Sequence, residues 1–94
     1  MKVQVDATGQ LRTAAGWGET TVELEDGTTL RGLLERLAAN TGALRPHLFD
    51  EEGRVQPSLL LVVNGAAVAG GAGAAAARLA DGDRVSLMPP VAGG

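Results

Sequence analysis

Residues 28–37 read TTLRGLLERL, and the leucines in this stretch follow the spacing of a helix. Thr28 or Thr29 can cap its first turn, because a threonine hydroxyl accepts a hydrogen bond from an exposed amide. We expect the helix to end near Gly42, since glycine is favoured just beyond a helix C-terminus. The leucines recur at i, i+3, i+4 and i+7, which predicts one buried helical face made of Leu30, Leu33, Leu34 and Leu37.

Alternating polar and apolar residues predict two strands before this helix. Val3 and Val5 alternate with polar neighbours, and so do Val22 and Leu24. Residues 8–18, which lie between them, are rich in glycine, alanine and threonine and indicate a loop. We therefore expect the two strands to form an opening hairpin.

A continuous apolar run predicts a strand after the helix. Leu59–Val63 is apolar throughout, so we expect a strand with both faces at least partly covered. The dipeptide Asn64-Gly65 favours a tight turn, followed by a short return strand over residues 66–68. Residues 69–77 hold only glycine and alanine, and because glycine opposes the helix that alanine favours, they predict a mobile loop.

The last predicted strand, Arg84–Met88, alternates so that Val85 and Leu87 face the core. The order of strand, strand, helix, strand, short strand and strand predicts an α+β protein with one main helix packed on one face of a mixed sheet. This is the arrangement of the ubiquitin-like β-grasp fold. A chain of 94 residues suffices for one domain, which we expect to span residues 1–88, with a flexible, extended C-terminal tail over 89–94.

The composition excludes several classes of function. A net charge of −3 argues against a nucleic-acid binder, and the absence of cysteine excludes disulfides and thiol chemistry by this chain. With His47 as the only histidine, no multi-histidine metal site is available. No segment is apolar for long enough to span a membrane, and the alternating first residues predict a strand rather than a signal peptide. We therefore expect a cytoplasmic protein without a metal, a nucleic-acid partner or a membrane partner.

The unusual chemical feature of the chain is residues 88–94, which read MPPVAGG. Pro89 and Pro90 have a fixed φ and no amide hydrogen, so they favour an extended spacer that cannot continue a sheet. Gly93 and Gly94 lack a Cβ, which lets the backbone enter a slot too narrow for any other residue. These properties indicate a C-terminus that enters another protein's active site and is modified there; a frayed end is the alternative.

Two motifs resemble the MoaD/ThiS family of ubiquitin-like sulfur carriers. They are residues 79–85, LADGDRV, and residues 89–94, PPVAGG. The helix opening at Thr29-Leu30 and the turn Val63-Asn64-Gly65 fit the same family, so the resemblance covers nearly the whole chain. Within the family, the diproline and the VAGG ending are most similar to the small subunit of molybdopterin synthase.

This resemblance implies that Gly94 is the reactive residue. A ubiquitin-activating-like adenylyltransferase would use ATP to adenylate its carboxylate, and a sulfurtransferase or persulfide donor would convert it to a thiocarboxylate. As the small subunit of molybdopterin synthase, the chain would donate this sulfur to the pterin precursor in molybdenum cofactor biosynthesis. The chain would be a non-catalytic carrier that binds no cofactor, because the catalytic groups would lie on the large subunit.

The resemblance also implies how the chain meets that large subunit. An apolar patch near the tail, including Met88, Leu59 and Leu61, would form the interface, and the tail would enter the partner's pocket through Pro89, Pro90, Val91, Ala92 and Gly93. Three other functions stay open. They are a carrier for thiamine, cysteine or another thiolated product, a protein modifier that Gly94 joins to lysines, and a plain binding module.

Overall fold

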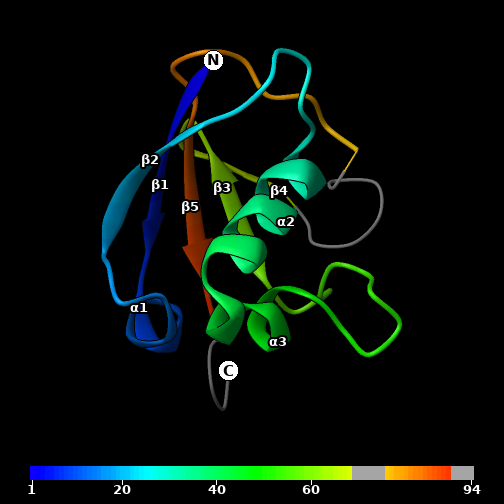
Figure 1. Cartoon of the computed structure of the whole chain (residues 1–94). Coiled ribbons are helices and arrows are strands. Elements are labelled where there is room, and N and C mark those ends of the chain that lie inside the picture. The colour runs from blue at the N-terminus through cyan, green and yellow to red at the C-terminus, as the bar shows by residue number, and fades with distance from the viewer. Residues whose placement is uncertain (69–75, 90–94) are drawn as a thin grey trace.

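One mixed sheet organises the part of the chain that this computed structural model describes, residues 1–68 and 76–89 (Figure 1). Its five strands are Lys2–Ala7 (β1), Glu19–Glu23 (β2), Leu60–Val63 (β3), Ala66–Val68 (β4) and Arg84–Met88 (β5). They lie in the order β2-β1-β5-β3-β4. β5 is therefore the central strand, parallel to β1 and antiparallel to β3.

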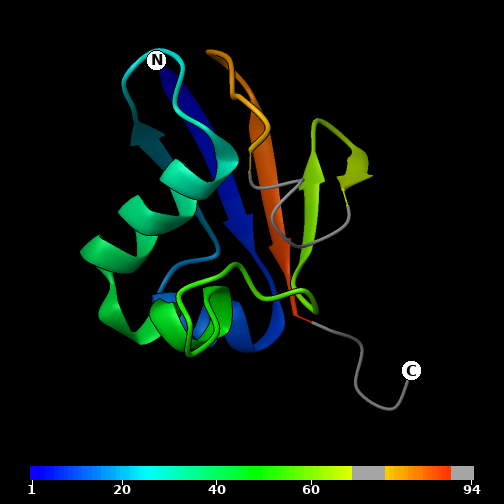
Figure 2. The same ribbon diagram turned by 90° about the vertical axis from the view of Figure 1, so that its right-hand side faces the viewer.

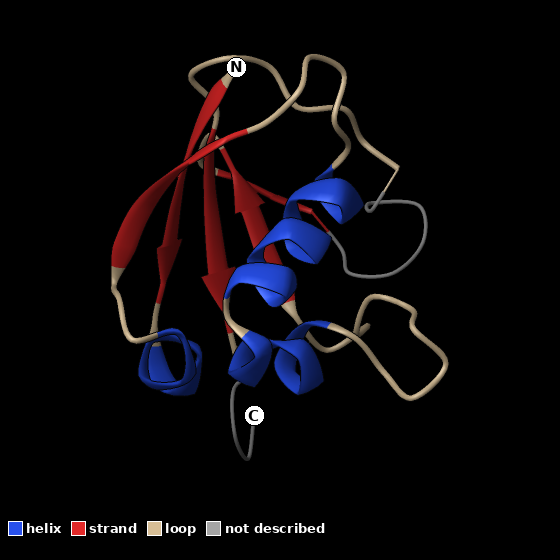
Figure 3. Cartoon of the chain, viewed as in Figure 1, coloured by secondary structure: helices blue, strands red, loops and turns tan. Residues whose placement is uncertain are grey.

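Helices cover one face of this sheet (Figures 2 and 3). The longest, α2 (Leu30–Asn40), crosses that face and buries its leucines against the strands. The shorter α1 (Gly9–Ala15) and α3 (Arg45–Leu48) lie toward the end of the sheet at which β5 finishes (Figure 1). This arrangement confirms the predicted α+β class with one main helix on the sheet. None of the helices in the described part of the chain is long and apolar enough to cross a membrane.

The predicted helix over residues 28–37 is confirmed as α2. Thr29 is its N-cap, and its hydroxyl oxygen accepts a hydrogen bond from the backbone N–H of Gly32 at 3.2 Å. The helix ends at Asn40 with Thr41 as its C-cap, slightly before the predicted stop. Gly42 instead opens a 3-10 turn, Gly42–Leu44, that leads into α3.

The predicted loop over residues 8–18 is wrong, because most of this segment forms α1. Leu11 is buried in the core, and Ala14 and Ala15, three and four residues later, pack against the same core. Gly16 ends the helix in the left-handed conformation, with φ +82°, and its N–H donates to the Arg12 carbonyl at 3.0 Å. β1 and β2 pair antiparallel as predicted, but a segment that contains a helix connects them in place of the predicted loop.

The turn after β3 is confirmed, whereas the bounds of β3 are corrected. Asn64 and Gly65 both adopt positive φ, +52° and +85°, and β4 returns antiparallel to β3. β3 begins at Leu60 rather than Leu59. Residues 69–75 of the predicted Gly/Ala loop lie outside the described residues.

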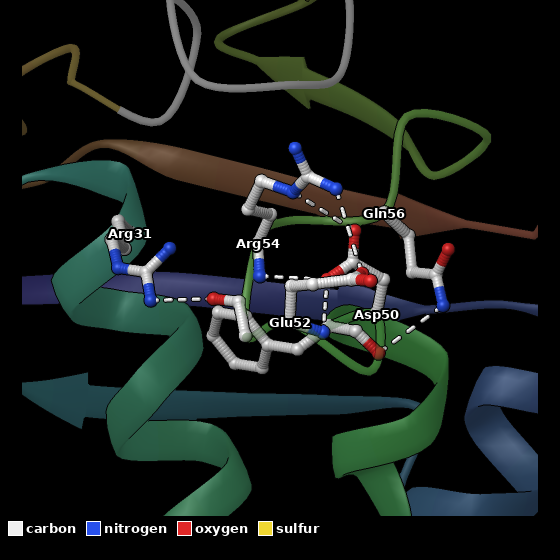
Figure 4. A network of polar contacts seen from close by, with 7 residues as sticks. Arg31, Asp50, Glu52, Arg54 and Gln56 are labelled. Carbon is white, nitrogen blue, oxygen red and sulfur yellow. Dashed lines mark hydrogen bonds and ion pairs between the residues drawn. The ribbon is translucent and has the colours of Figure 1, made fainter.

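The acidic stretch after α3 forms a tight turn (Figure 4). The Asp50 carboxylate accepts the backbone N–H groups of Glu52 at 3.0 Å and Arg54 at 2.9 Å. The pKa of Asp50 lies below its ordinary value, chiefly because of the hydrogen bond from the Arg54 backbone. Arg31, on α2, donates to the Gly53 carbonyl at 2.7 Å, which ties the turn to the main helix.

Candidate functional site at the base of the C-terminal tail

Strand β5 carries the chain to the predicted tail. Its bounds, Arg84–Met88, match the prediction, and Val85 and Leu87 face the core with no exposed surface. Because side chains alternate along a strand, Ser86 and Met88 lie on the opposite face of the sheet. Pro89 follows directly and is half-buried. The remaining tail residues predicted to be functional lie outside the described residues, and their roles stay predictions: Pro90, Val91, Ala92, Gly93 and Gly94.

The start of β5 is held by contacts between residues 79–85 and the Asn64 turn, both of which contributed to the family resemblance. The Asp83 carboxylate accepts the Asn64 side-chain amide at 2.9 Å and the Ala80 backbone N–H at 2.8 Å. The Asn64 side-chain oxygen in turn accepts the Arg84 backbone N–H at 2.9 Å. The pKa of Asp83 is lowered, first by the hydrogen bond from Asn64 and next by the one from Ala80. These residues therefore serve the structure by fixing where β5 begins.

The end of β5 is held by the start of α1. The Thr8 backbone N–H donates to the Leu87 carbonyl at 3.3 Å, and the ring of Pro89 packs against Gly9. Gly9 adopts a φ of +57°, which favours glycine. The sequence reasoning missed Gly9 as part of this site. A glycine two residues after the end of a strand was the one signal that could have found it.

The predicted apolar interface is corrected by the burial of two of its members. Leu59 and Leu61 are 2% and 0% exposed, so their side chains belong to the core and offer no surface to a partner. Leu60 is 38% exposed, and it lies opposite Met88 in the β3–β5 register. Val62, half-buried, follows Leu60 on the same face by strand alternation. We call Leu60, Val62 and Met88 the Leu60 patch.

The same face becomes polar and charged toward β1 and β2. The Arg84 guanidinium lies over this half of the sheet, 2.6 Å from the Gln4 side-chain oxygen and 3.9 Å from carboxylate oxygens of both Asp6 and Glu19. Exposed ion pairs of this kind contribute little to stability. They do give the Leu60 patch a polar border. In protein interfaces, a few central residues inside such a border carry most of the binding energy.

His47 and Trp17, the remaining residues with distinctive side chains, pack within the fold. His47 is half-buried in α3, and Trp17 is partly buried against the core. Within residues 1–68 and 76–89, no three His, Cys, Asp or Glu side chains gather as metal ligands would. Among the described residues, the candidate site is therefore the end of β5 and the surface beside it.

Comparison with known proteins places this geometry in a family. The ThiS family profile matches residues 5–94, which include both the β5 strand and the Gly93-Gly94 ending. The chain belongs to the ThiS family, and the predicted resemblance to ubiquitin-like sulfur carriers is confirmed. No curated protein sequence matches the chain.

Solved structures share the whole fold. The crystal structure of SAMP1 from Haloferax volcanii is 26% identical, with a TM-score of 0.88 and 100% of each chain covered. A Pyrococcus furiosus protein assigned as subunit 1 of molybdopterin converting factor is 29% identical, with a TM-score of 0.76 over 97% of this chain and 99% of that one. A chain in the BexX/CysO complex of Amycolatopsis orientalis is 27% identical, with a TM-score of 0.70 over 98% and 99%. The predicted β-grasp fold is thereby confirmed.

Proposed function

We propose that the chain carries sulfur as a thiocarboxylate on Gly94. The observation that supports this most directly is the ThiS family match, which runs through residue 94. A carboxylate is a poor acyl donor, so an adenylyltransferase first joins the Gly94 carboxylate to the AMP of ATP and releases pyrophosphate. A persulfide sulfur then attacks the carbonyl and displaces AMP. A second thiol cleaves the resulting S–S bond, forming a disulfide and leaving the thiocarboxylate. Because this chain has no cysteine, both sulfur groups come from partners.

We propose the pterin precursor of the molybdenum cofactor as the sulfur acceptor. The chain would act as the small subunit of molybdopterin synthase, as the likeness to the Pyrococcus furiosus protein and the PPVAGG ending suggest. The large subunit would bind the Leu60 patch, take the tail into its pocket and supply the catalytic acid and base. Two prolines reduce the entropy that the tail loses on entry, because they are restricted already in the free chain.

The likeness to SAMP1, a small archaeal modifier protein, favours a second candidate. In that case the Gly94 adenylate or thioester is attacked by a lysine amine, and the product is an isopeptide bond. The likeness to a chain in the BexX/CysO complex keeps a carrier for another thiolated product as a further alternative. All three functions begin with adenylation, so the acceptor distinguishes them.

Intact mass spectrometry separates these functions. The chain is incubated with its activating enzyme, ATP and a persulfide donor, and then with the large subunit and the pterin precursor. In the first step, we expect one oxygen of the Gly94 carboxylate to be replaced by sulfur. Addition of the large subunit and the precursor should then restore the original mass. Lysine-linked adducts in cell extract, without sulfur transfer to the precursor, favour the modifier. A chain lacking Gly93-Gly94 is the control, and any modification of that control contradicts the proposal.

The Leu60 patch is tested by its affinity for the large subunit. Leu60→Asp should weaken binding by about 2 kcal/mol, the scale of a central interface residue. Thr21→Asp places the same charge on the same sheet face but on β2, away from the patch, so it serves as the matched control. Equal affinities of the two variants, measured by calorimetry, contradict a role for the patch.

A further inference from the structure

The ring of Pro89 packs against Gly9, which has no side chain. A Cβ placed on Gly9 would lie 3.0 Å from Cγ and 3.7 Å from Cδ of the Pro89 ring. Optimal contacts between carbon atoms are about 3.5–4.0 Å, so a side chain at position 9 would push the proline away. The ring occupies the space that the absent side chain leaves.

Gly9 is held in place by contacts of the residues on both sides of it in the chain. Immediately before it, Thr8 donates its N–H to Leu87 at the end of β5. The Thr8 carbonyl accepts the N–H groups of Leu11 at 3.2 Å and Arg12 at 3.4 Å, which starts the helix. Leu11 is itself buried in the core. Gly9 is therefore held between a central strand and a core residue, and it cannot follow Pro89 if Pro89 moves.

We propose that Gly9 is a positioning residue for the C-terminal tail. Because Gly9 has no Cβ, the Pro89 ring can pack directly against it. This contact sets the position of Pro89 and thereby the direction in which the chain continues beyond it. Its effect on activation rests on the proposed function, in which the Gly94 carboxylate must reach a partner's active site. Misplacement of a reacting group by about 1 Å can cost on the order of a hundredfold in rate, so a small displacement of Pro89 matters.

The chain contains a matched control at the other end of the same helix. Gly16 also has a positive φ, +82°, but a Cβ there would meet nothing within 4 Å. Gly9→Ala and Gly16→Ala therefore introduce the same kind of backbone strain, and only the first affects Pro89. Gly9→Asn is a second test variant, because asparagine tolerates left-handed φ while still carrying a Cβ.

Two measurements test the proposal. The direction of the tail is followed by energy transfer from Trp17, the only tryptophan, to a dye on Ala92→Cys, which labels uniquely because the chain has no other cysteine. Activation is followed by the KM and kcat of pyrophosphate exchange with the activating enzyme, using the unlabelled chain. We expect Gly9→Ala and Gly9→Asn to change the transfer efficiency and to raise KM roughly tenfold with a smaller change in kcat. Gly16→Ala, which lies beside the Trp17 donor, is the control for activation and should leave KM unchanged.

A double-mutant cycle identifies the contact that carries the effect. Pro89→Ala removes the Cγ and Cδ atoms that a Cβ at position 9 would meet, so Gly9→Ala should have little further effect in that background. The proposal is overturned if Gly9→Ala gives the same transfer efficiency as the wild type, or if the effect of Gly9→Ala persists without the proline ring. If the wild-type chain is not activated at all, the proposed function fails. Energy transfer still decides whether Gly9 sets the direction of the tail.

Discussion

Strand β5 is fixed by side-chain hydrogen bonds where it begins and by packing against a glycine where it ends. At its start, Asn64 and Asp83 form bonds of 2.9 Å with each other and with neighbouring backbone. At its end, besides the pairing of Leu87 with Ala7 and of Met88 with Leu60, there are one backbone bond of 3.3 Å and the Gly9–Pro89 contact. We therefore expect the start of β5 to support stability and, under the proposed function, its end to support presentation of the tail. Substitutions at the start of β5 should therefore change stability, and substitutions at its end should change activation.

The largest effect is expected at the end, from Gly94→Ala. Under the proposed function, the added methyl group would meet a slot narrow enough to admit only glycine backbone, so activation should fall by at least about a hundredfold. The thermal midpoint should match that of the wild type. The measurement is thiocarboxylate yield by intact mass, with Ala92→Gly as the control that removes a methyl group from the same tail. A normal thiocarboxylate yield from Gly94→Ala would contradict the assignment of activation to the tail beyond β5.

Leu87→Ala should lower stability strongly, because it empties a core position in the central strand. The expected loss in the free energy of unfolding is about 2–5 kcal/mol, measured by urea denaturation. Ser86→Ala, on the opposite face of the same strand, should cost much less. At a temperature where both variants are folded, their activation rates should agree. A large difference in rate would show that the core itself, and not only the end of β5, sets presentation.

Asn64→Gly should lower stability by about 1 kcal/mol, because it removes the side-chain hydrogen bonds at the start of β5 while glycine accepts the φ of +52°. Asn64→Ala should cost more, since alanine adds strain at that φ. Neither change should alter the KM for activation. Chemical denaturation and pyrophosphate exchange on the same samples test both statements. A raised KM would mean that the two ends of β5 are coupled.

The smallest effect concerns the pH dependence of Asp83. Its pKa in the folded chain lies below the ordinary value of 3.8, so its contribution to stability is present above pH 3.8 and is lost as the pH falls through the lower folded value. Asp83→Asn should therefore be less stable than the wild type near neutral pH, and the difference should shrink in acid. Thermal midpoints measured across this range check the sign. A difference that grows in acid contradicts the hydrogen-bond geometry.

Local patterns in the sequence predict the elements that local physics determines. The leucine spacing predicts α2, because each leucine must meet the same buried face. The dipeptide Asn64-Gly65 predicts its turn, because both residues tolerate positive φ. Alternation along Arg84–Met88 predicts the bounds and inward residues of β5.

The remaining features depend on contacts between distant segments. α1 has one large buried residue, Leu11, and begins at a glycine, which has a low helix propensity, so its own sequence favours a loop. The run Leu59–Val63 is apolar at every position, so alternation cannot show that Leu61 points inward and Leu60 outward. Pairing with β5 decides that register. The seat for Pro89 on Gly9 likewise appears only when the two ends of the chain are brought together.

The central place of β5 has a consequence for how the protein is made. β5 is the last strand in chain order, and in the described sheet it alone joins the β1–β2 pair to the β3–β4 pair. A chain whose synthesis stops before residue 84 therefore retains two separate pairs, without the long-range contacts that complete the core. Such a chain also lacks Gly94. Under the proposed function, residues 84–94 thus supply both the strand that joins the two halves of the sheet and the carboxylate that an activating enzyme selects.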